Sequence, residues 1–220
     1  MAFEWVSPMA PMEKGEDNGV GGIENPELYM GETDISVSFT SFMAAVVFFF
    51  MGLLLTGDPK LQVRLRVPLI FLFLSALGFL YSTIIYANAS GELSRLRKHS
   101  FNRQISAGNI ISEYFGVYCL IFAIPITILG YSPDRVLAVI ILILSSTGFF
   151  MYHYLGYSIL ERYVGRPALN YVVAALLGLH ITSFYEFLRE NIIAYYVLSA
   201  MLLTTIGAIT IMSIRKEEVG

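Results

Sequence analysis

Six apolar stretches of similar length are the feature that most limits how this chain can fold. They cover residues 37–56, 67–87, 110–129, 136–158, 168–187 and 192–212, and charged or proline-marked breaks separate them. An α-helix needs about 20 apolar residues to cross the hydrocarbon core of a bilayer. Its backbone polar groups must also be satisfied internally. We therefore predict an all-α, polytopic integral membrane protein with a bundle of six transmembrane helices over residues 36–214.

The composition supports this class and excludes several others. Charged residues make up 14% of the chain and hydrophobic residues 56%, whereas about a quarter of a soluble domain is charged. The single cysteine, Cys119, lies in an apolar stretch, so neither a disulfide framework nor a cysteine-based metal site is expected. The chain contains no nucleotide-binding loop and no HExxH sequence. We therefore expect no bound cofactor and no metal, and we favour a protein that is not an enzyme.

The segments outside the spans are short and charged. Residues 1–35 hold eight acidic residues and one lysine, Lys14. Such a segment has too little apolar surface to offset the entropy lost on ordering. It is predicted to be a disordered tail, with a docking or cation-attracting arm as the alternative. Residues 215–220 form a short charged tail at the C-terminus.

The longest polar connection, residues 88–109, is basic and also carries apolar side chains. It contains Arg95, Arg97, Lys98, His99 and Arg103. It is expected either to lie on an anionic headgroup surface or to be a solvated linker. Placing both termini in the cytoplasm puts nine basic residues inside and five outside, which slightly favours that orientation.

Residues 135–187 form an apolar hairpin with a polar break at residues 161–166 and one histidine in each arm. Counting helical rise from the break places His153 and His180 about one turn apart in depth. His153, Tyr157 and Glu161 follow one another at a spacing of four residues, so on one helix they would share a face. Glu186 lies towards the far end of the second arm. We interpret the histidines either as the functional interior or as two core residues with satisfied nitrogens.

Glu113 lies one turn inside the third apolar stretch. A carboxylate exposed to hydrocarbon is costly, so Glu113 is expected to face the bundle interior or to reach headgroup water. Tyr118 is five residues further on, a spacing that does not share a face in an α-helix.

Small residues recur every four positions on the last two spans. Ala174, Gly178 and Thr182 do so on the fifth, and Ala200, Thr204 and Ala208 on the sixth. This spacing lets the backbones of membrane helices approach closely, so we predict these residues at helix contacts.

Three classes of function fit these observations. The first is a transport protein, channel or solute-binding subunit whose pathway is lined by Glu113, His153, Tyr157, Glu161, His180 and Glu186. The second is a non-catalytic structural or assembly subunit of a membrane complex. The third is a redox subunit with His153 and His180 as axial haem ligands. The expected partners are the lipid bilayer and either further copies of the chain or other membrane subunits, with no nucleic acid.

Overall fold

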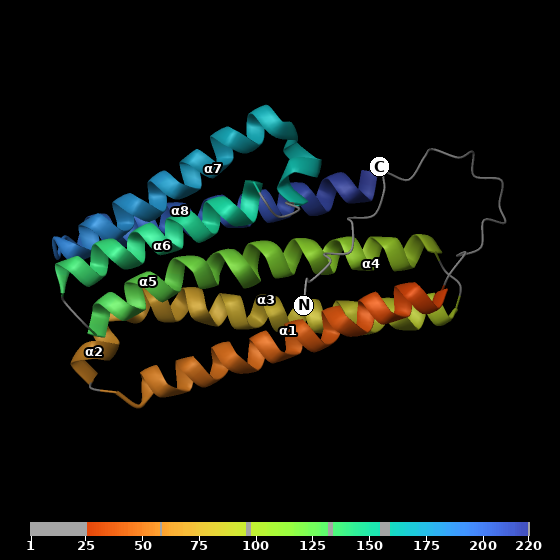
Figure 1. Cartoon of the computed structure of the whole chain (residues 1–220), viewed down its shortest axis with the longest axis horizontal. Helices are drawn as coiled ribbons and strands as arrows, with labels where there is room; N and C mark the ends of the chain where they lie inside the picture. Colours follow the sequence, from red (N-terminus) through yellow and green to blue (C-terminus); the bar gives the residue numbers. More distant parts are fainter. Residues whose placement is uncertain (1–25, 58, 96–97, 132–133, 155–158, 220) are drawn as a thin grey trace, which may run out of the picture.

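The fold is a bundle of long helices (Figure 1). The computed structural model describes residues 26–57, 59–95, 98–131, 134–154 and 159–219. All the regular elements in these ranges are helices. Six helical segments are long and apolar enough to cross a membrane: Tyr29–Leu55, Arg66–Ser94, His99–Tyr131, Val136–His153, Leu169–Leu188 and Ile192–Arg215. The predicted all-α bundle of six transmembrane helices is therefore confirmed.

The third span is built from three elements, which together we call the third helix. They are α4 (Lys98–Ile111), the π-helix η1 (Ser112–Tyr118) and α5 (Cys119–Tyr131). The other spans are single helices, and a short helix lies between the first two. Their bounds are α1 (Pro26–Leu55), α2 (Pro59–Arg64), α3 (Arg66–Ser94), α6 (Arg135–Tyr154), α7 (Ile159–Leu188) and α8 (Ile192–Val219).

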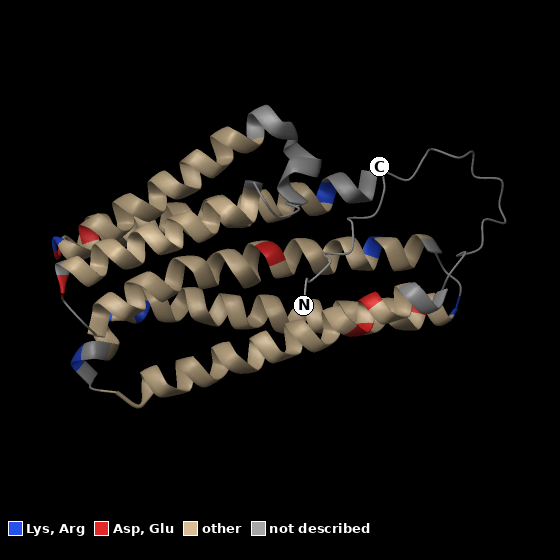
Figure 2. Ribbon diagram, in the orientation of Figure 1, with Lys and Arg blue, Asp and Glu red and all other residues tan. Residues whose placement is uncertain are grey.

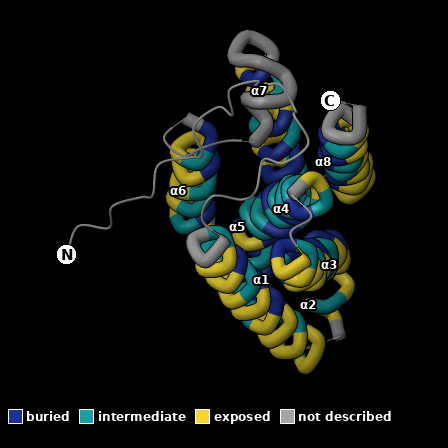
Figure 3. The backbone as a smooth tube through the Cα atoms, turned by 90° about the vertical axis from the view of Figure 1, so that its right-hand side faces the viewer, coloured by how far each residue is buried: buried dark blue, intermediate teal, exposed yellow. Residues whose placement is uncertain are grey.

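The third helix occupies the centre of the bundle. Seen along the helices, α4 and α5 lie between α1 and α3 on one side and α6, α7 and α8 on the other (Figure 3). In the most apolar part of the third helix 56% of the residues are buried, against 17% in α6. Helix α6 is therefore peripheral, and the third helix supplies the core against which the others pack.

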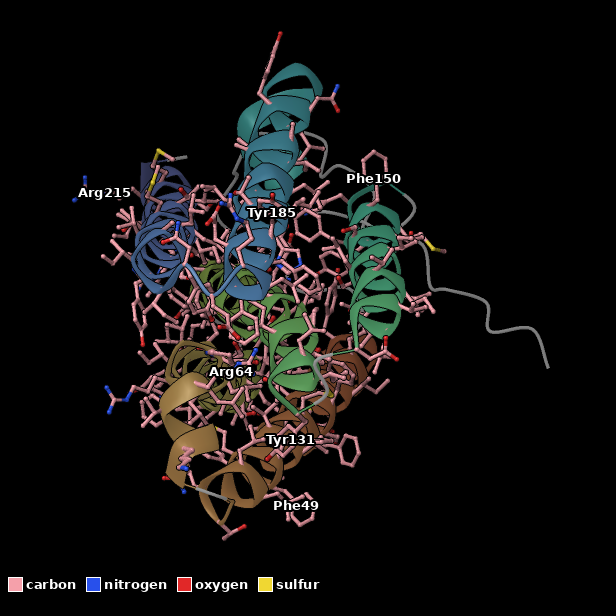
Figure 4. All side chains as sticks on the ribbon, turned by 90° about the vertical axis from the view of Figure 1, so that its left-hand side faces the viewer. Phe49, Arg64, Tyr131, Phe150, Tyr185 and Arg215 are labelled. Carbon is pink, nitrogen blue, oxygen red and sulfur yellow. The ribbon has the colours of Figure 1, made fainter. Side chains whose placement is uncertain are left out.

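The outer surface is that of a protein in lipid. Exposed side chains include Phe49 on α1 and Phe150 on α6, both of which point away from the bundle (Figure 4). Charged residues gather towards the two ends of the bundle (Figure 2). The first turns of α1 and the last turn of α8 lie at the same end (Figure 1), as an even number of spans requires.

The prediction of a polar linker at residues 88–109 was wrong. Helix α3 continues to Ser94 and α4 begins at Lys98, so most of this segment is helical. Described apolar side chains of this segment pack within the protein: Ala89, Leu93 and Phe101 form a small core, and the Phe101 ring packs edge-on against Tyr29. Hydropathy identifies only the apolar part of a helix. Helices α3 and α4 continue beyond their apolar stretches and pack against each other there.

Two other predicted boundaries also move. The polar break at residues 161–166 lies inside α7, which begins at Ile159. The predicted tail falls largely outside the described residues, but its last ten positions are the first turns of α1, which begins at Pro26. Pro26 stands at the first helical position of α1, where its missing N–H costs no hydrogen bond.

Gly78 allows the backbone of α3 to come into contact with the backbone of the third helix. A Cβ atom added at Gly78 would lie 2.6 Å from the amide nitrogen of Gly116 and 2.8 Å from the carbonyl carbon of Phe115. Backbone atoms held in a helix cannot move aside as the end of a flexible side chain can. This contact therefore fixes how closely the two central helices pack, in the way small residues do in membranes.

We expect Gly78→Ala to destabilise the protein by about 1–3 kcal/mol, the usual cost of forcing an extra methyl group into a packed core. Gly178→Ala is the matched control, because a Cβ atom at Gly178 would meet nothing within 4 Å. The control should leave stability unchanged or raise it by up to about 1 kcal/mol through helix propensity. Thermal unfolding in detergent measures both, and equal midpoints for the two variants would contradict the close approach.

Both ends of the chain should be accessible from one side of the membrane. Cysteines introduced at Met30 and Arg215, near the start of α1 and the end of α8, should react with an impermeant maleimide from the same face. Cysteines at Asp134 and Arg189, in the connections at the opposite end, should react only from the other face. The native Cys119 is buried and provides a low background. Labelling of Met30→Cys and Arg215→Cys from opposite faces would be incompatible with six spans.

Candidate functional site

The third helix changes its hydrogen-bond pattern in the middle of the bundle. Residues Ser112–Tyr118 form a π-helix between two α-helical segments. In a π-helix the backbone bonds connect residues i and i+5 instead of i and i+4, and such turns are often found at functional sites. The thiol of Cys119 lies 3.9 Å from the carbonyl oxygen of Tyr114, five residues earlier. This contact spans the same five positions as the backbone bonds of a π-helix. In such a turn, residues five positions apart lie near one another.

The π-helical turn places Glu113 and Tyr118 side by side. The Tyr118 hydroxyl donates a hydrogen bond to Oε1 of Glu113 at 3.2 Å, and both residues are buried. The spacing argument that separated these two residues assumed an α-helix, and it was wrong for this turn. Glu113 is only 3% exposed. The structure therefore favours the interior position for this carboxylate over one that reaches headgroup water.

His153 completes a three-residue cluster around the Tyr118 hydroxyl. Its Nδ1 lies 3.3 Å from that oxygen, and the imidazole and phenol rings are 5.1 Å apart between centroids. His153 is near the end of α6 and is 2% exposed. One hydroxyl thus lies within hydrogen-bonding distance of a carboxylate from its own helix and an imidazole from a neighbouring helix. We call Glu113, Tyr118 and His153 the triad.

His180 lies beside the same core, one turn further along the third helix. Its ring is 4.8 Å from that of Phe122, four residues after Tyr118, so the two histidines contact positions about 6 Å apart along the helix axis. This agrees with the predicted one-turn difference in depth. His180 is 1% exposed. Within the described part of the chain, neither of its ring nitrogens has a hydrogen-bond partner, contrary to the expectation of a satisfied core histidine.

Phenyl rings occupy the region between the two histidines. Phe149 packs against His153 at 4.6 Å and against Phe122 at 5.7 Å, and Phe122 packs against His180. A haem ligated by both imidazoles would need its flat macrocycle in this region. The packing of the described residues therefore does not fit the haem hypothesis. Among the same residues, no group of three or more His, Cys, Asp or Glu side chains is placed to hold a metal ion.

The electrostatic setting of the triad is unusual for a buried carboxylate. None of the six apolar stretches contains a lysine or arginine. Within these stretches, the imidazoles of His153 and His180 are the only side chains able to carry a positive charge. Glu113 also lies within electrostatic range of the hydroxyl groups of Tyr86 and Tyr152. In the triad, Tyr118 lies between the carboxyl group of Glu113 and the imidazole of His153, two side chains of types that can each bind a proton.

The three remaining predicted pathway residues are Tyr157, Glu161 and Glu186. Tyr157 lies outside the described residues. Glu161 belongs to α7, not to the helix of His153, so the predicted ladder on one helix face is wrong. Glu186 is partly buried near the end of α7, where Arg189 lies 3.8 Å away. It forms part of the helix end and not of the interior cluster.

The small-residue positions of the last two spans face outward. Ala174, Gly178 and Thr182 on α7 are exposed, as are Ala200, Thr204 and Ala208 on α8. They are therefore not buried in this chain, and the prediction that they lie at helix contacts stays a prediction. Thr204 and Ala208 instead line a shallow groove between α7 and α8.

Sequence reasoning missed the residues of α3 that support the triad. The Ser75 hydroxyl donates to the carbonyl oxygen of Gly116 at 2.7 Å, and the Tyr86 hydroxyl donates to Oδ1 of Asn109. Ser75, Gly78, Ser82 and Tyr86 recur every three or four positions, so they share one face of α3. That spacing of small and polar residues was the available signal.

Comparison with known proteins gives no further guide to the function. No protein-family model, curated protein or solved structure matches this chain.

We expect Tyr118→Phe to lower the free energy of unfolding by about 1–3 kcal/mol, because the ring remains but a buried carboxylate and imidazole lose a hydrogen-bonding group. Tyr171→Phe is the control: that residue is 79% exposed, and its loss of a hydroxyl should cost no more than about 0.5 kcal/mol. Unfolding in detergent compares the two. A Tyr118→Phe variant as stable as Tyr171→Phe would show that the bridging hydroxyl contributes nothing.

Proposed function

We propose that this chain is a membrane transport protein that moves protons, alone or together with a solute, through Glu113, Tyr118 and His153. The observation that carries the proposal is the position of the Tyr118 hydroxyl, 3.2 Å from a buried carboxylate oxygen and 3.3 Å from a buried imidazole nitrogen. Ionisable residues inside a membrane bundle are costly and commonly mark ion pathways and proton relays.

The triad supports proton transfer by a simple exchange of hydrogen bonds. In one arrangement Nδ1–H of His153 donates to the Tyr118 oxygen while the Tyr118 hydroxyl donates to the Glu113 carboxylate. When His153 is the doubly protonated imidazolium, transfer of its Nδ1 proton to Tyr118, and of the phenolic proton to Glu113, leaves a neutral carboxyl group and a neutral imidazole. Tyr118 regains its hydrogen and accepts from the carboxyl group. Both arrangements use the same heavy-atom positions.

The cost of burial is a further argument for a functional carboxylate. Taking an ion out of water costs several kcal/mol even after relaxation, and replacing buried ionic groups by apolar residues of similar volume is often neutral or stabilising. A purely structural core at this position would be served by apolar side chains. Phe122 and Phe149, which pack beside the triad, are such side chains.

A proton-flux measurement tests the proposal. Purified protein is reconstituted into vesicles that contain a pH-sensitive dye, and a potassium gradient with valinomycin sets the membrane potential. Internal pH should change faster in vesicles with the parent protein than in those with Glu113→Gln or without protein. Glu32→Gln, a change at a partly exposed acidic residue near the start of α1, should behave like the parent.

A tightly coupled transporter moves protons only together with its solute, so the measurement is repeated with imposed gradients of pooled small solutes. If the parent and Glu113→Gln vesicles give the same flux throughout, the transport proposal is rejected.

A second function has one specific observation in its favour. The outward-facing small residues of α7 and α8, and the groove between these helices, would allow a helix of another subunit to pack closely. The chain would then be a structural subunit of a membrane complex. In that case Glu113→Gln would leave proton flux unchanged.

A further inference from the structure

One contact between α3 and the third helix lies directly at the π-helical turn. The Ser75 hydroxyl donates a buried hydrogen bond to the Gly116 carbonyl oxygen at 2.7 Å. The same carbonyl accepts the backbone N–H of Cys119, the residue at which the π-helix gives way to α5. Ser75 is therefore hydrogen-bonded to the third helix at the position where the π-helix ends and the α-helix α5 begins.

The surroundings allow little freedom at this point. Ser75 is fully buried, and Gly78, one turn further along α3, touches the backbone of Phe115 and Gly116. The next residue of α3, Phe79, is equally close: a Cβ atom at Gly116 would lie 2.7 Å from its ring. Helix α3 thus holds the π-helical turn by one hydrogen bond and by backbone contact.

The geometry of the turn decides whether Glu113 meets Tyr118. On an α-helix, with about 100° per residue, two side chains five positions apart point about 140° away from each other. The observed Glu113–Tyr118 hydrogen bond therefore requires the wide turn. If the turn changed to α-helical hydrogen bonding, the hydrogen bond between the Tyr118 hydroxyl and the Glu113 carboxylate would be lost.

We propose that Ser75 is the positioning residue of the triad. Its hydrogen bond to Gly116 maintains the π-helical turn, and the turn in turn maintains the hydrogen bond between Tyr118 and Glu113. Ser75 itself touches none of the three triad side chains in any described hydrogen bond. The role in proton movement rests on the proposed function, whereas the positioning of Glu113 does not.

The chain offers a closely matched control. Ser82 is also fully buried on α3 and donates to a glycine carbonyl of the third helix, that of Gly108, at 3.0 Å. Gly108 lies in the α-helical segment α4, outside the π-helical turn. Ser75→Ala and Ser82→Ala therefore remove the same kind of bond from the same helix pair, and only the first touches the turn.

The experiment is infrared spectroscopy of the full chain in detergent with ring-labelled tyrosine. The band of Tyr118 is assigned by its loss in Tyr118→Phe, and its position without the carboxylate is taken from Glu113→Ala. We expect Ser75→Ala to move this band to its position in Glu113→Ala, and Ser82→Ala to leave it as in the parent. Both serine variants should lower the melting temperature by a similar amount, so stability alone would not distinguish them.

A Tyr118 band that stays unchanged in Ser75→Ala, or that moves equally in Ser82→Ala, overturns the proposal. Should Ser75→Ala not fold, Ser75→Cys is measured in its place, because a thiol keeps the size of the side chain but is a weak donor. The same variants are tested for proton flux. A band shift in Ser75→Ala together with a parent protein that moves no protons would retain the positioning role and reject the transport function.

Discussion

The close contact between α3 and the third helix is the constraint on which the rest of this structure depends. Gly78 lets the two backbones touch at Gly116, and Ser75 bonds to the carbonyl group at the same point. Packing of this kind, and not hydrophobicity, associates helices in lipid. The contact sets the position of the π-helical turn, the turn sets the direction of Glu113, and α6 then supplies His153 on the opposite side of Tyr118. The interior cluster is thus a consequence of backbone packing on its far side.

Much of the architecture could be predicted from the sequence, because the number of spans follows from the number of apolar stretches of sufficient length. The ends of the helices could not. Residues 88–94 and 98–109 are helical although they are polar, since they pack on each other through Leu93 and Phe101 beyond the apolar stretches. Hydropathy detects the apolar length that a helix needs to cross a bilayer. It does not detect helices that pack on each other beyond the apolar stretches.

The candidate site was only partly predictable for a different reason. Glu113 and His153 are identified by being ionisable within apolar stretches, and both lie in the interior cluster. Tyr118, which links them, was not predicted as a partner of Glu113 because the side-chain directions were derived for an α-helix. No residue pattern in the sequence predicted the π-helical turn. The small residues of α7 and α8 are a different case. Their spacing is a true pattern, but the pattern is the same whether a helix face meets its own bundle or, as here, points outward.

The π-helical turn also has a consequence for how this protein can change during evolution. Each i to i+5 turn contains one residue more than an i to i+4 turn. A deletion of a single codon within residues 112–118 could therefore restore a continuous α-helix without breaking the span. The two halves of the third helix are each anchored separately, by Tyr86 to Asn109 on one side and by the contact of Leu65 with Gly130 on the other. Such a deletion would remove the interior cluster while leaving the membrane topology intact, so a single insertion or deletion at this turn can switch the site on or off without replacing any of its side chains.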